Sequence, residues 1–493
     1  MTEAEYAEVA AACDRLLRAP GTDLARLAIP LLHLLNEHPS WLAQYAPVLV
    51  PLARTTPHDR PRTALRLARG LVRSLAARSV APAPHGPIDV IIVSHLIRPE
   101  QLQRGDDFYF GALQSQLAAQ GTTSLLVLIS HLPQVRILPD ASPRFPRLIL
   151  SETVSAATEL GIWRLSARAG RALRREAAAL QDGIDRRLAL LASRLACSAA
   201  TLGNLRMYAA IARLCQAVNP KVVLTTYEGT VAERLIWLGA RTARRRPLCA
   251  GYQHAMVLKR AHAIRRSVAA PGLDCDPDAV LTLGNLPHAT LAASAGLQSV
   301  RLIAYGSHRR AAMAMPAELR RRPRCCLVMP DASEQECVRL FDFALRCAAL
   351  DPTLRFALRP HPMVDWGALQ RRHPRWQRLP DNVSLSAGGP PEQDFAQTRY
   401  CLYRGSSAAL HAVRAGIKPF YLEVPGELVF DCLFELDEWR ETVATPQELI
   451  DRIDAADSTL DAVTARRAAS VCERYVAPIR SAALSELLAL APS

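Results

Sequence analysis

The chain has 493 residues and a formal net charge of +14; 50% of its residues are hydrophobic and 22% are charged. This balance excludes an intrinsically disordered chain, and the length predicts two large domains and an extension. Only three of the 60 basic residues are Lys, and the Arg residues are spread along the chain, which does not favour a nucleic-acid-binding protein. A basic surface still favours anionic partners such as nucleotides, phosphates or the cytoplasmic face of a membrane.

The first part of the chain is predicted to be helical. Residues 1–80 show helical spacing of Leu, Ala and Val, interrupted by prolines. The N-terminus is acidic and lacks the apolar core of a secretory signal, and no run reaches the ~18 apolar residues of a membrane-spanning helix. The twelve scattered cysteines favour reduced thiols in a cytosolic protein. The Pro-rich stretch 81–87 reads as a linker, so we expect a helical extension over 1–85.

An alternating α/β pattern follows the linker. A short apolar run at 89–94 predicts a buried strand, residues 108–120 a helix, and 123–130 a second strand parallel to the first. A mostly helical, Arg-rich and Ala-rich insertion covers about 152–218. The further strands of this block are expected at 221–226, 248–252, 278–283 and 300–305. We assign this block, residues 86–308, to a first domain.

A second alternating block covers residues 309–493. Its strands are expected at 325–329, 354–358, 400–403 and 419–424, and its helices at 333–350, 407–415, 447–455 and 462–488. Two successive α/β blocks predict two doubly wound domains side by side. Such domains bind ligands at the carboxyl ends of their strands, so we expect a site in the cleft between them.

The segment Arg359-Pro-His-Pro362 directly follows an expected strand. Pro360 and Pro362 stiffen this turn and hold His361 in a fixed direction. An imidazole there can donate to a phosphate or protonate a leaving group near neutral pH. The alternative is a rigid turn with an exposed His.

The segment Tyr403-Arg-Gly-Ser-Ser-Ala408 joins a predicted strand to a helix. Gly405 allows a close approach of the backbone, and Ser406 and Ser407 fall at the start of the helix. Their hydroxyls and the unpaired N–H groups form an anion site, or the serines simply cap the helix.

In the first block, Glu228 of Thr226-Tyr-Glu-Gly229 lies at the end of a strand and faces the expected cleft. It either acts as a base or stabilises the following helix by its charge. Two further segments at strand ends contain candidates for substrate contacts: Gln253 and His254, then Arg98 and Asp107. A structural histidine and a solvated loop are the respective alternatives.

Several motifs are absent from the sequence. The chain has no GxGxxG after the first strand, no GxxxxGK[ST], no HExxH and no GxSxG. No acidic pair lies in a convincing strand-end context. We therefore expect neither a metal site nor a bound cofactor.

Together these motifs resemble those of GT-B glycosyltransferases, and in particular of the bacterial sialyltransferases and polysialyltransferases. The Kdo transferases of capsule and lipopolysaccharide assembly are similar in outline, as is a broader group of surface-carbohydrate biosynthesis proteins. The resemblance covers roughly residues 220–425. It implies two facing Rossmann-like domains, a nucleotide-sugar donor bound mainly to the second domain and an acceptor bound mainly to the first.

The resemblance also implies roles for individual residues. Glu228 matches the acidic residue before Gly that acts as base on the acceptor hydroxyl; in those enzymes a second acidic residue usually precedes it, and here that position is Tyr227. His361 matches the His that contacts the CMP phosphate and helps the leaving group. Ser406 and Ser407 match the pair that holds this phosphate, and Arg359 adds positive charge beside the donor.

The resemblance therefore implies a metal-independent glycosyltransferase that moves a CMP-activated ulosonic acid, of the sialic acid or Kdo type, onto a bacterial surface glycan. The expected partners are a nucleotide sugar and a glycan or lipid-linked glycan acceptor, not nucleic acid. The expected location is cytoplasmic, with peripheral contact to the inner membrane. The alternatives are a UDP- or GDP-sugar transferase, a nucleotide-sugar epimerase of the same fold, and a basic scaffold or nucleic-acid binder.

Overall fold

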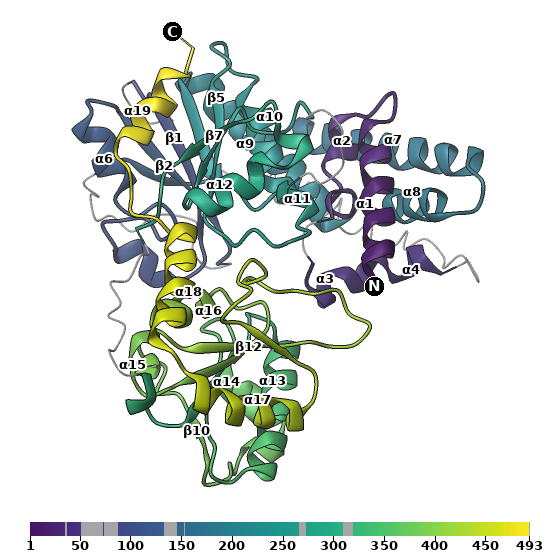
Figure 1. Ribbon diagram of the computed structural model, residues 1–493. Coiled ribbons are helices and arrows are strands. Elements are labelled where there is room, and N and C mark those ends of the chain that lie inside the picture. Colours follow the sequence, from purple (N-terminus) through teal and green to yellow (C-terminus); the bar gives the residue numbers. More distant parts are fainter. Residues whose placement is uncertain are drawn as a thin grey trace.

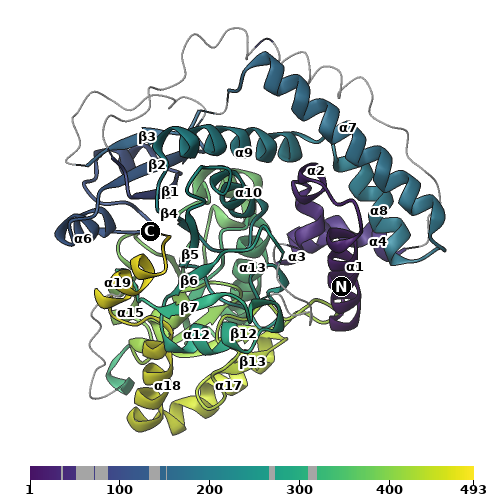
Figure 2. The same ribbon diagram turned by 90° about the horizontal axis from the view of Figure 1, so that it is seen from above.

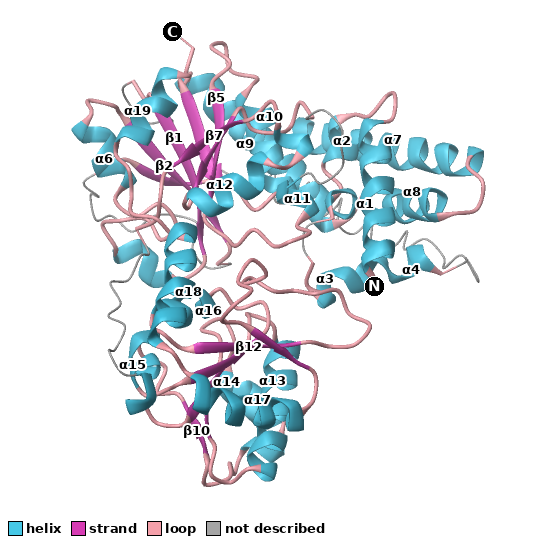
Figure 3. Cartoon of the chain, in the orientation of Figure 1, coloured by secondary structure: helices cyan, strands magenta, loops and turns pink. Residues whose placement is uncertain are grey.

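The computed structural model describes residues 1–34, 37–50, 72, 87–132, 145–151, 153–265, 273–308 and 319–492. These residues form two parallel sheets, one above the other in Figure 1 and Figure 3, with a group of helices beside the upper one. The expected boundary near residue 85, most of the expected linker and residues 309–318 lie outside the described residues.

The first sheet has seven parallel strands in the order β3-β2-β1-β4-β5-β6-β7. Its central strands are buried on both faces, which explains their uninterrupted apolar sequence. The short edge strand β3 has no such run and was not predicted. The strands are β1 Val90–Leu96, β2 Ser124–Ser130, β3 Arg147–Ile149, β4 Val222–Thr226, β5 Leu248–Gln253, β6 Ala279–Thr282 and β7 Arg301–Ala304.

The second sheet has six parallel strands in the order β10-β9-β8-β11-β12-β13. The four central strands were predicted, and the three-residue edge strands β10 and β13 were not. The strands are β8 Cys325–Met329, β9 Arg355–Leu358, β10 Val383–Leu385, β11 Tyr400–Tyr403, β12 Lys418–Leu422 and β13 Glu441–Val443.

Helices connect the strands and cover both sheets. In the first domain they are α6 Leu113–Ala119, α9 Ala199–Val218, α10 Val231–Ala240, α11 His262–Arg265 and α12 Asn285–Ala292. In the second they are α13 Glu334–Leu350, α14 Trp366–Arg372, α15 Pro391–Ala396, α16 Ala408–Arg414 and α17 Pro446–Thr459. The predicted fold class, two Rossmann-like α/β domains preceded by helices, is confirmed by these strand orders.

Each sheet has a point where the strand order reverses, between β1 and β4 in the first domain and between β8 and β11 in the second. Connections on the two sides of this point leave the sheet in opposite directions, which opens a crevice at the carboxyl ends of the strands. The two reversal points therefore mark where each domain offers a ligand site.

The N-terminal helices pack against the predicted insertion and form one helical arm with it (Figure 2). Val9 and Leu16 of α1 share an apolar core with Leu173 of α7 and Leu188 of α8. The arm comprises α1 Glu3–Arg18, α2 Leu24–Leu27, α3 Pro39–Leu42, α4 Ala46–Leu49, α7 Ala156–Ala179 and α8 Ile184–Leu195. The extension and the insertion thus form one unit, a relationship that the sequence did not indicate.

The C-terminal end of the chain returns to the first domain. The single helix expected over 462–488 is wrong: α18 Ala462–Tyr475 and α19 Ala482–Ala489 are separated by an irregular stretch containing Pro478. In this stretch the Ala477 N–H donates to the Leu283 carbonyl at 2.8 Å. The Arg480 N–H donates to the Tyr305 carbonyl, also at 2.8 Å. These bonds attach the end of the predicted second domain to the first sheet.

Candidate functional site

A chain of polar side chains crosses the reversal point of the first sheet. His95 near the end of β1 lies 3.0 Å from His131 (Nδ1 to Nε2) and 3.3 Å from Thr226 (Nε2 to Oγ1). The Thr226 hydroxyl donates to Glu233, so its oxygen accepts from His95 Nε2, and His95 Nδ1 accepts from His131. Burial, together with the charge of His131, lowers the pKa of His95 to about 4. His95 is therefore neutral at physiological pH.

The Tyr-Glu-Gly turn after β4 directs Glu228 out of the protein. The Tyr227 ring is buried, and its hydroxyl donates to the Ile264 carbonyl at 2.9 Å. Gly229 has φ +78°, and a Cβ there would lie 2.4 Å from the carbonyl carbon of Ala263. Although Tyr227 and Gly229 on either side of it are buried, the Glu228 side chain is 45% exposed. Its Oε1 lies 2.9 Å from Nε2 of His254.

The start of the following helix, α10, bears on the two roles considered for Glu228. The N-terminus of α10 is capped by Thr230 and Glu233, whose side chains bond each other's backbone N–H groups. The Glu233 carboxyl group also accepts the N–H of Glu228 at 2.9 Å. Burial and the charge of Glu228 raise the pKa of Glu233 to about 8. The hydrogen-bonded cap of α10 thus comes from Thr230 and Glu233, and the Glu228 carboxylate faces His254.

Three other predicted residues of this domain take different positions. His254 lies against the Tyr109 ring, with 4.7 Å between the ring centroids, beside Glu228. Gln253 is fully buried, and its amide bonds the Ala255 carbonyl and the Leu283 N–H. The Asp107 carboxylate accepts from Ser94 and from two backbone N–H groups of its own turn. Gln253 and Asp107 therefore hold loops in place through these bonds, and the substrate contacts expected of them stay predictions.

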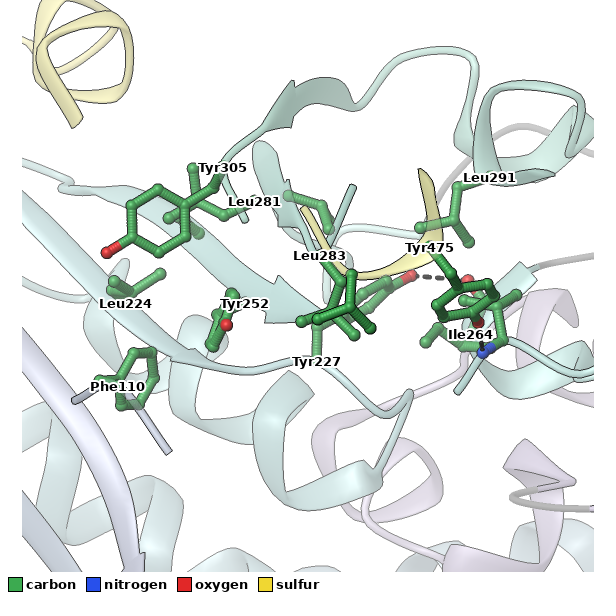
Figure 4. Close-up of a cluster of buried hydrophobic side chains, with 14 of the residues drawn as sticks. Phe110, Leu224, Tyr227, Tyr252, Ile264, Leu281, Leu283, Leu291, Tyr305 and Tyr475 are labelled. Atoms are coloured by element: carbon green, nitrogen blue, oxygen red, sulfur yellow. Dashed lines mark hydrogen bonds between the residues drawn. The ribbon is translucent and has the colours of Figure 1, made fainter. Parts of the chain in front are cut away.

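An aromatic layer supports this site from inside the domain. Figure 4 shows Tyr227, Tyr252 and Tyr305 among leucines of the sheet, with Tyr475 of α18 at one end. The Tyr252 ring lies 5.5 Å from Phe110 and 5.6 Å from Tyr305. Large interlocking rings of this kind leave little room for the strand ends to move.

In the second domain, the loops after β8 and β11 flank the reversal point. The Arg404 guanidinium is buried and pairs with Glu336 and Glu427, at 2.6 Å each. Gly405 has φ +70°, and a Cβ there would lie 1.8 Å from the ring of Phe430. The backbone is thus held close to Phe430, with Ser406 buried and Ser407 exposed. Ser407 occupies the N-cap position of α16 but makes no side-chain cap, so the simple capping alternative does not hold for it.

The His-Pro turn lies beside these loops at the end of β9. His361 Nδ1 accepts the Met363 N–H at 3.2 Å, which leaves the proton of the neutral ring on Nε2. Burial lowers the pKa of His361, opposed by the charge of Asp331 and assisted by that of Arg98. His361 is therefore placed to donate a hydrogen bond from Nε2 at neutral pH.

The other predicted residues of this turn differ in exposure and in contacts. Pro362 is exposed. The Arg359 guanidinium pairs with Asp394 and also donates to the Gly389 carbonyl at 2.7 Å. Arg359 therefore braces the loop after β10, and much of its charge is already balanced.

The two domains meet at these loops. Arg98, in the loop after β1, places its Nη2 4.0 Å from the sulfur of Met363 in the His-Pro turn. Of the predicted residues, Glu228 and His254 are brought together in the first domain. Arg98 and His361, from different domains, lie close enough for the charge of Arg98 to contribute to the lowered pKa of His361.

Sequence reasoning missed three histidines of the site. His95 lies at the end of a predicted strand, so the strand-end rule that selected Glu228 applies to it and to His131 as well. His38 comes from the helical arm, and its Nε2 lies 3.1 Å from Oδ2 of Asp331. Its ring packs edge-on against Phe430, with 5.0 Å between centroids. No α/β motif surrounds His38, so nothing in the sequence pointed to it.

Comparisons with known proteins give remote likenesses only. No family model and no curated protein matches the chain. Among solved structures, a sucrose-phosphate synthase from Thermosynechococcus elongatus is 13% identical with a TM-score of 0.46, covering 81% of this chain and 97% of that one. The glycosyltransferase SnogD from Streptomyces nogalater is 14% identical with a TM-score of 0.43, covering 82% and 99%. A putative UDP-N-acetylglucosamine 2-epimerase from Listeria monocytogenes is 11% identical with a TM-score of 0.45, covering 81% and 96%.

Two further properties of the described residues concern metal binding and membrane insertion. They contain no group of three or more His, Cys, Asp or Glu side chains placed to hold a metal ion. No single described helix is long and apolar enough to cross a membrane, although α8 and α9 meet that test together as a pair bent by 68°.

Proposed function

We propose that this protein is a glycosyltransferase that moves a CMP-activated ulosonic acid, of the sialic acid or Kdo type, onto a bacterial surface glycan. The observation that carries the proposal is the position of the Glu228–His254 pair. A half-exposed carboxylate at the reversal point of the first sheet is placed to act as a base. The Arg98–Met363 contact joins this edge to the turn that holds His361.

The first domain supplies the base. In the proposed reaction, the Glu228 carboxylate takes the proton of the acceptor hydroxyl, and the acceptor oxygen bonds to the anomeric carbon of the donor sugar. His254, 2.9 Å away, holds the carboxylate in position. The capping of α10 by Glu233 leaves Glu228 available for this role.

The second domain binds the donor in this proposal. As the bond between the anomeric carbon and the phosphate oxygen breaks, CMP leaves with that oxygen. His361 Nε2–H and the hydroxyls of Ser406 and Ser407 donate to the phosphate and stabilise its developing charge. Since these donors stabilise the charge on the leaving group, we expect a chelator of divalent cations to leave the rate unchanged.

The test is a reaction with CMP-sialic acid or CMP-Kdo, with and without an oligosaccharide acceptor. The proposal predicts CMP release coupled to a gain of one sugar by the acceptor, seen by mass spectrometry. Transfer from UDP- or GDP-sugars would show that the donor is not a CMP-sugar, and conversion of a nucleotide sugar without acceptor would indicate an epimerase. Absence of transfer from every donor in the presence of a range of acceptors would contradict the proposal.

A further inference from the structure

Four arginines form a row along one face of α7 in the helical arm. Arg164, Arg168, Arg171 and Arg175 are all exposed. Their spacing of four, three and four residues places them within about 60° of one another around the helix, over a length of ~16 Å. We call these four side chains the α7 arginine row.

The packing of the arm fixes the direction of this row. The opposite face of α7 buries Ile162, Trp163, Ala169, Leu173 and Ala177. These residues pack against the apolar cores that α7 shares with α1, α2, α8 and α9. In Figure 2, α7 lies at the upper right, outside the other described helices of the arm. The arginine row is therefore held outward by a rigid support.

No acidic side chain balances the row within the described part of the chain. Both acidic residues of α7 lie off this face and are already paired: Glu159 with Arg206 at 2.6 Å, and Glu176 with Arg26 at 2.7 Å. The four arginines take part in none of the ion pairs of the described residues, whereas Arg15 on α1 pairs with Asp185 at 2.8 Å. Like charges three and four residues apart destabilise a helix, and an external anionic partner would remove this repulsion.

We propose that the α7 arginine row docks the protein on an anionic membrane surface. The straight α7 arginine row can contact the phosphate groups of lipid headgroups, which lie in one plane at a membrane surface. Each guanidinium group can bind a phosphate with two parallel hydrogen bonds. Leu160, 37% exposed, continues the row toward the N-terminus of α7 and adds an apolar side chain at the contact. A single-stranded nucleic acid fits less well, because the exposed face of α7 has no aromatic side chain on which bases stack. This proposal does not depend on the chemistry in the cleft.

The experiment compares sedimentation of the full-length protein with phosphatidylcholine vesicles and with vesicles that also contain phosphatidylglycerol. The test variant carries Arg164→Gln, Arg168→Gln, Arg171→Gln and Arg175→Gln. The matched control carries the same charge change on four exposed arginines of the second domain and α18, namely Arg346, Arg355, Arg466 and Arg467. Thermal unfolding checks that all three proteins are folded.

The proposal predicts that the wild type and the control bind only the anionic vesicles, that salt weakens binding, and that the α7 variant binds at least ~10-fold more weakly. The salt dependence of binding is measured on the wild type, so this test does not depend on whether the variants fold. Equal binding of the wild type to vesicles with and without phosphatidylglycerol overturns the proposal, as does equal binding by the α7 variant and the control. Tighter binding to single-stranded RNA than to anionic vesicles, lost in the α7 variant, overturns it in favour of a nucleic-acid partner.

Discussion

The imidazole of His38 in the helical arm lies 3.1 Å from the carboxylate of Asp331 in the second domain (Nε2 to Oδ2). His38 is buried and packs edge-on against Phe430, the residue that touches Gly405. The arm therefore reaches the reversal point of the second sheet, and one side chain of the arm contacts the loops after β8 and before β13.

Replacing His38 with Ala removes the partner of Asp331 and opens a space beside Phe430. We expect His38→Ala to lose roughly 2–4 kcal/mol of unfolding free energy, because a buried polar contact to Asp331 and a packed ring are both lost. Denaturant unfolding measures this loss. The matched control is Ser40→Ala, which removes only the hydroxyl beside His38 Nδ1. A His38→Ala protein as stable as the Ser40→Ala protein would mean that the arm is not coupled to this loop.

Glu228→Gln tests the proposed base. The side chain is half-exposed and does not cap α10, so the variant should fold normally and bind donor normally. Loss of a general base lowers turnover by about 10²–10⁴-fold, and we expect turnover to fall within that range. The control Glu8→Gln replaces an exposed carboxylate of α1 and should leave turnover unchanged. Near-normal turnover of Glu228→Gln would remove Glu228 from the mechanism.

His361→Ala should lower turnover at least ~100-fold. Since the proton of the neutral ring lies on Nε2, a Gln at this position can replace the donor, and we expect His361→Gln to recover part of the loss. Unchanged turnover in His361→Ala would show that this side chain does not act on the leaving group.

The pH dependence separates two roles for His361. Burial lowers the pKa of His361 below 6.5, so the neutral, hydrogen-bond-donating form predominates at pH 7 and persists as the pH falls to 6.5. If the neutral ring is the active form, the part of the pH–rate profile that His361→Gln abolishes does not rise as the pH falls from 8 to 6.5. A rate that rises throughout this interval on acidification would assign His361 the role of a protonated acid.

Gly405→Ala tests the close approach of the loop after β11. The variant suffers both a left-handed backbone conformation and an overlap with the Phe430 ring. The matched control is Gly388→Ala, at φ +75° with no atom within 4 Å of the added Cβ. We expect a loss of about 1 kcal/mol for the control and at least ~2 kcal/mol more for Gly405→Ala, measured by denaturant unfolding. Equal losses would show that the Phe430 contact is easily displaced.

The sequence predicted the central strands and the strand-end loops because their signals are local. The apolar run before Ser94 and the turn residues around Gly229 and Gly405 are sufficient to place a strand and the loop after it. The edge strands β3, β10 and β13 were missed because three residues beside a loop carry no run long enough to recognise.

Contacts between distant segments could not be predicted. His38 meets Asp331, and the Tyr475 hydroxyl accepts the N–H of Val257, only because the arm and the C-terminal helices fold back over the domains. Similarly, Gln253 and Asp107 look like site residues in the sequence, but the backbone groups that occupy them become visible only in the folded chain. Residue type and strand-end position identify candidate site residues in the sequence. Their hydrogen bonds and burial in the folded chain then distinguish residues that hold loops in place from residues that face solvent.

The most direct test of the account is thermal unfolding with CMP, CDP, UDP, GDP and ADP, each with and without magnesium. A nucleotide bound only to the folded chain adds about 2.7 kcal/mol when present at ~100 times its dissociation constant. The account predicts that CMP raises the unfolding midpoint of the wild type without magnesium and raises that of His361→Ala less. A midpoint that responds to none of these nucleotides would contradict a donor site at His361, Ser406 and Ser407.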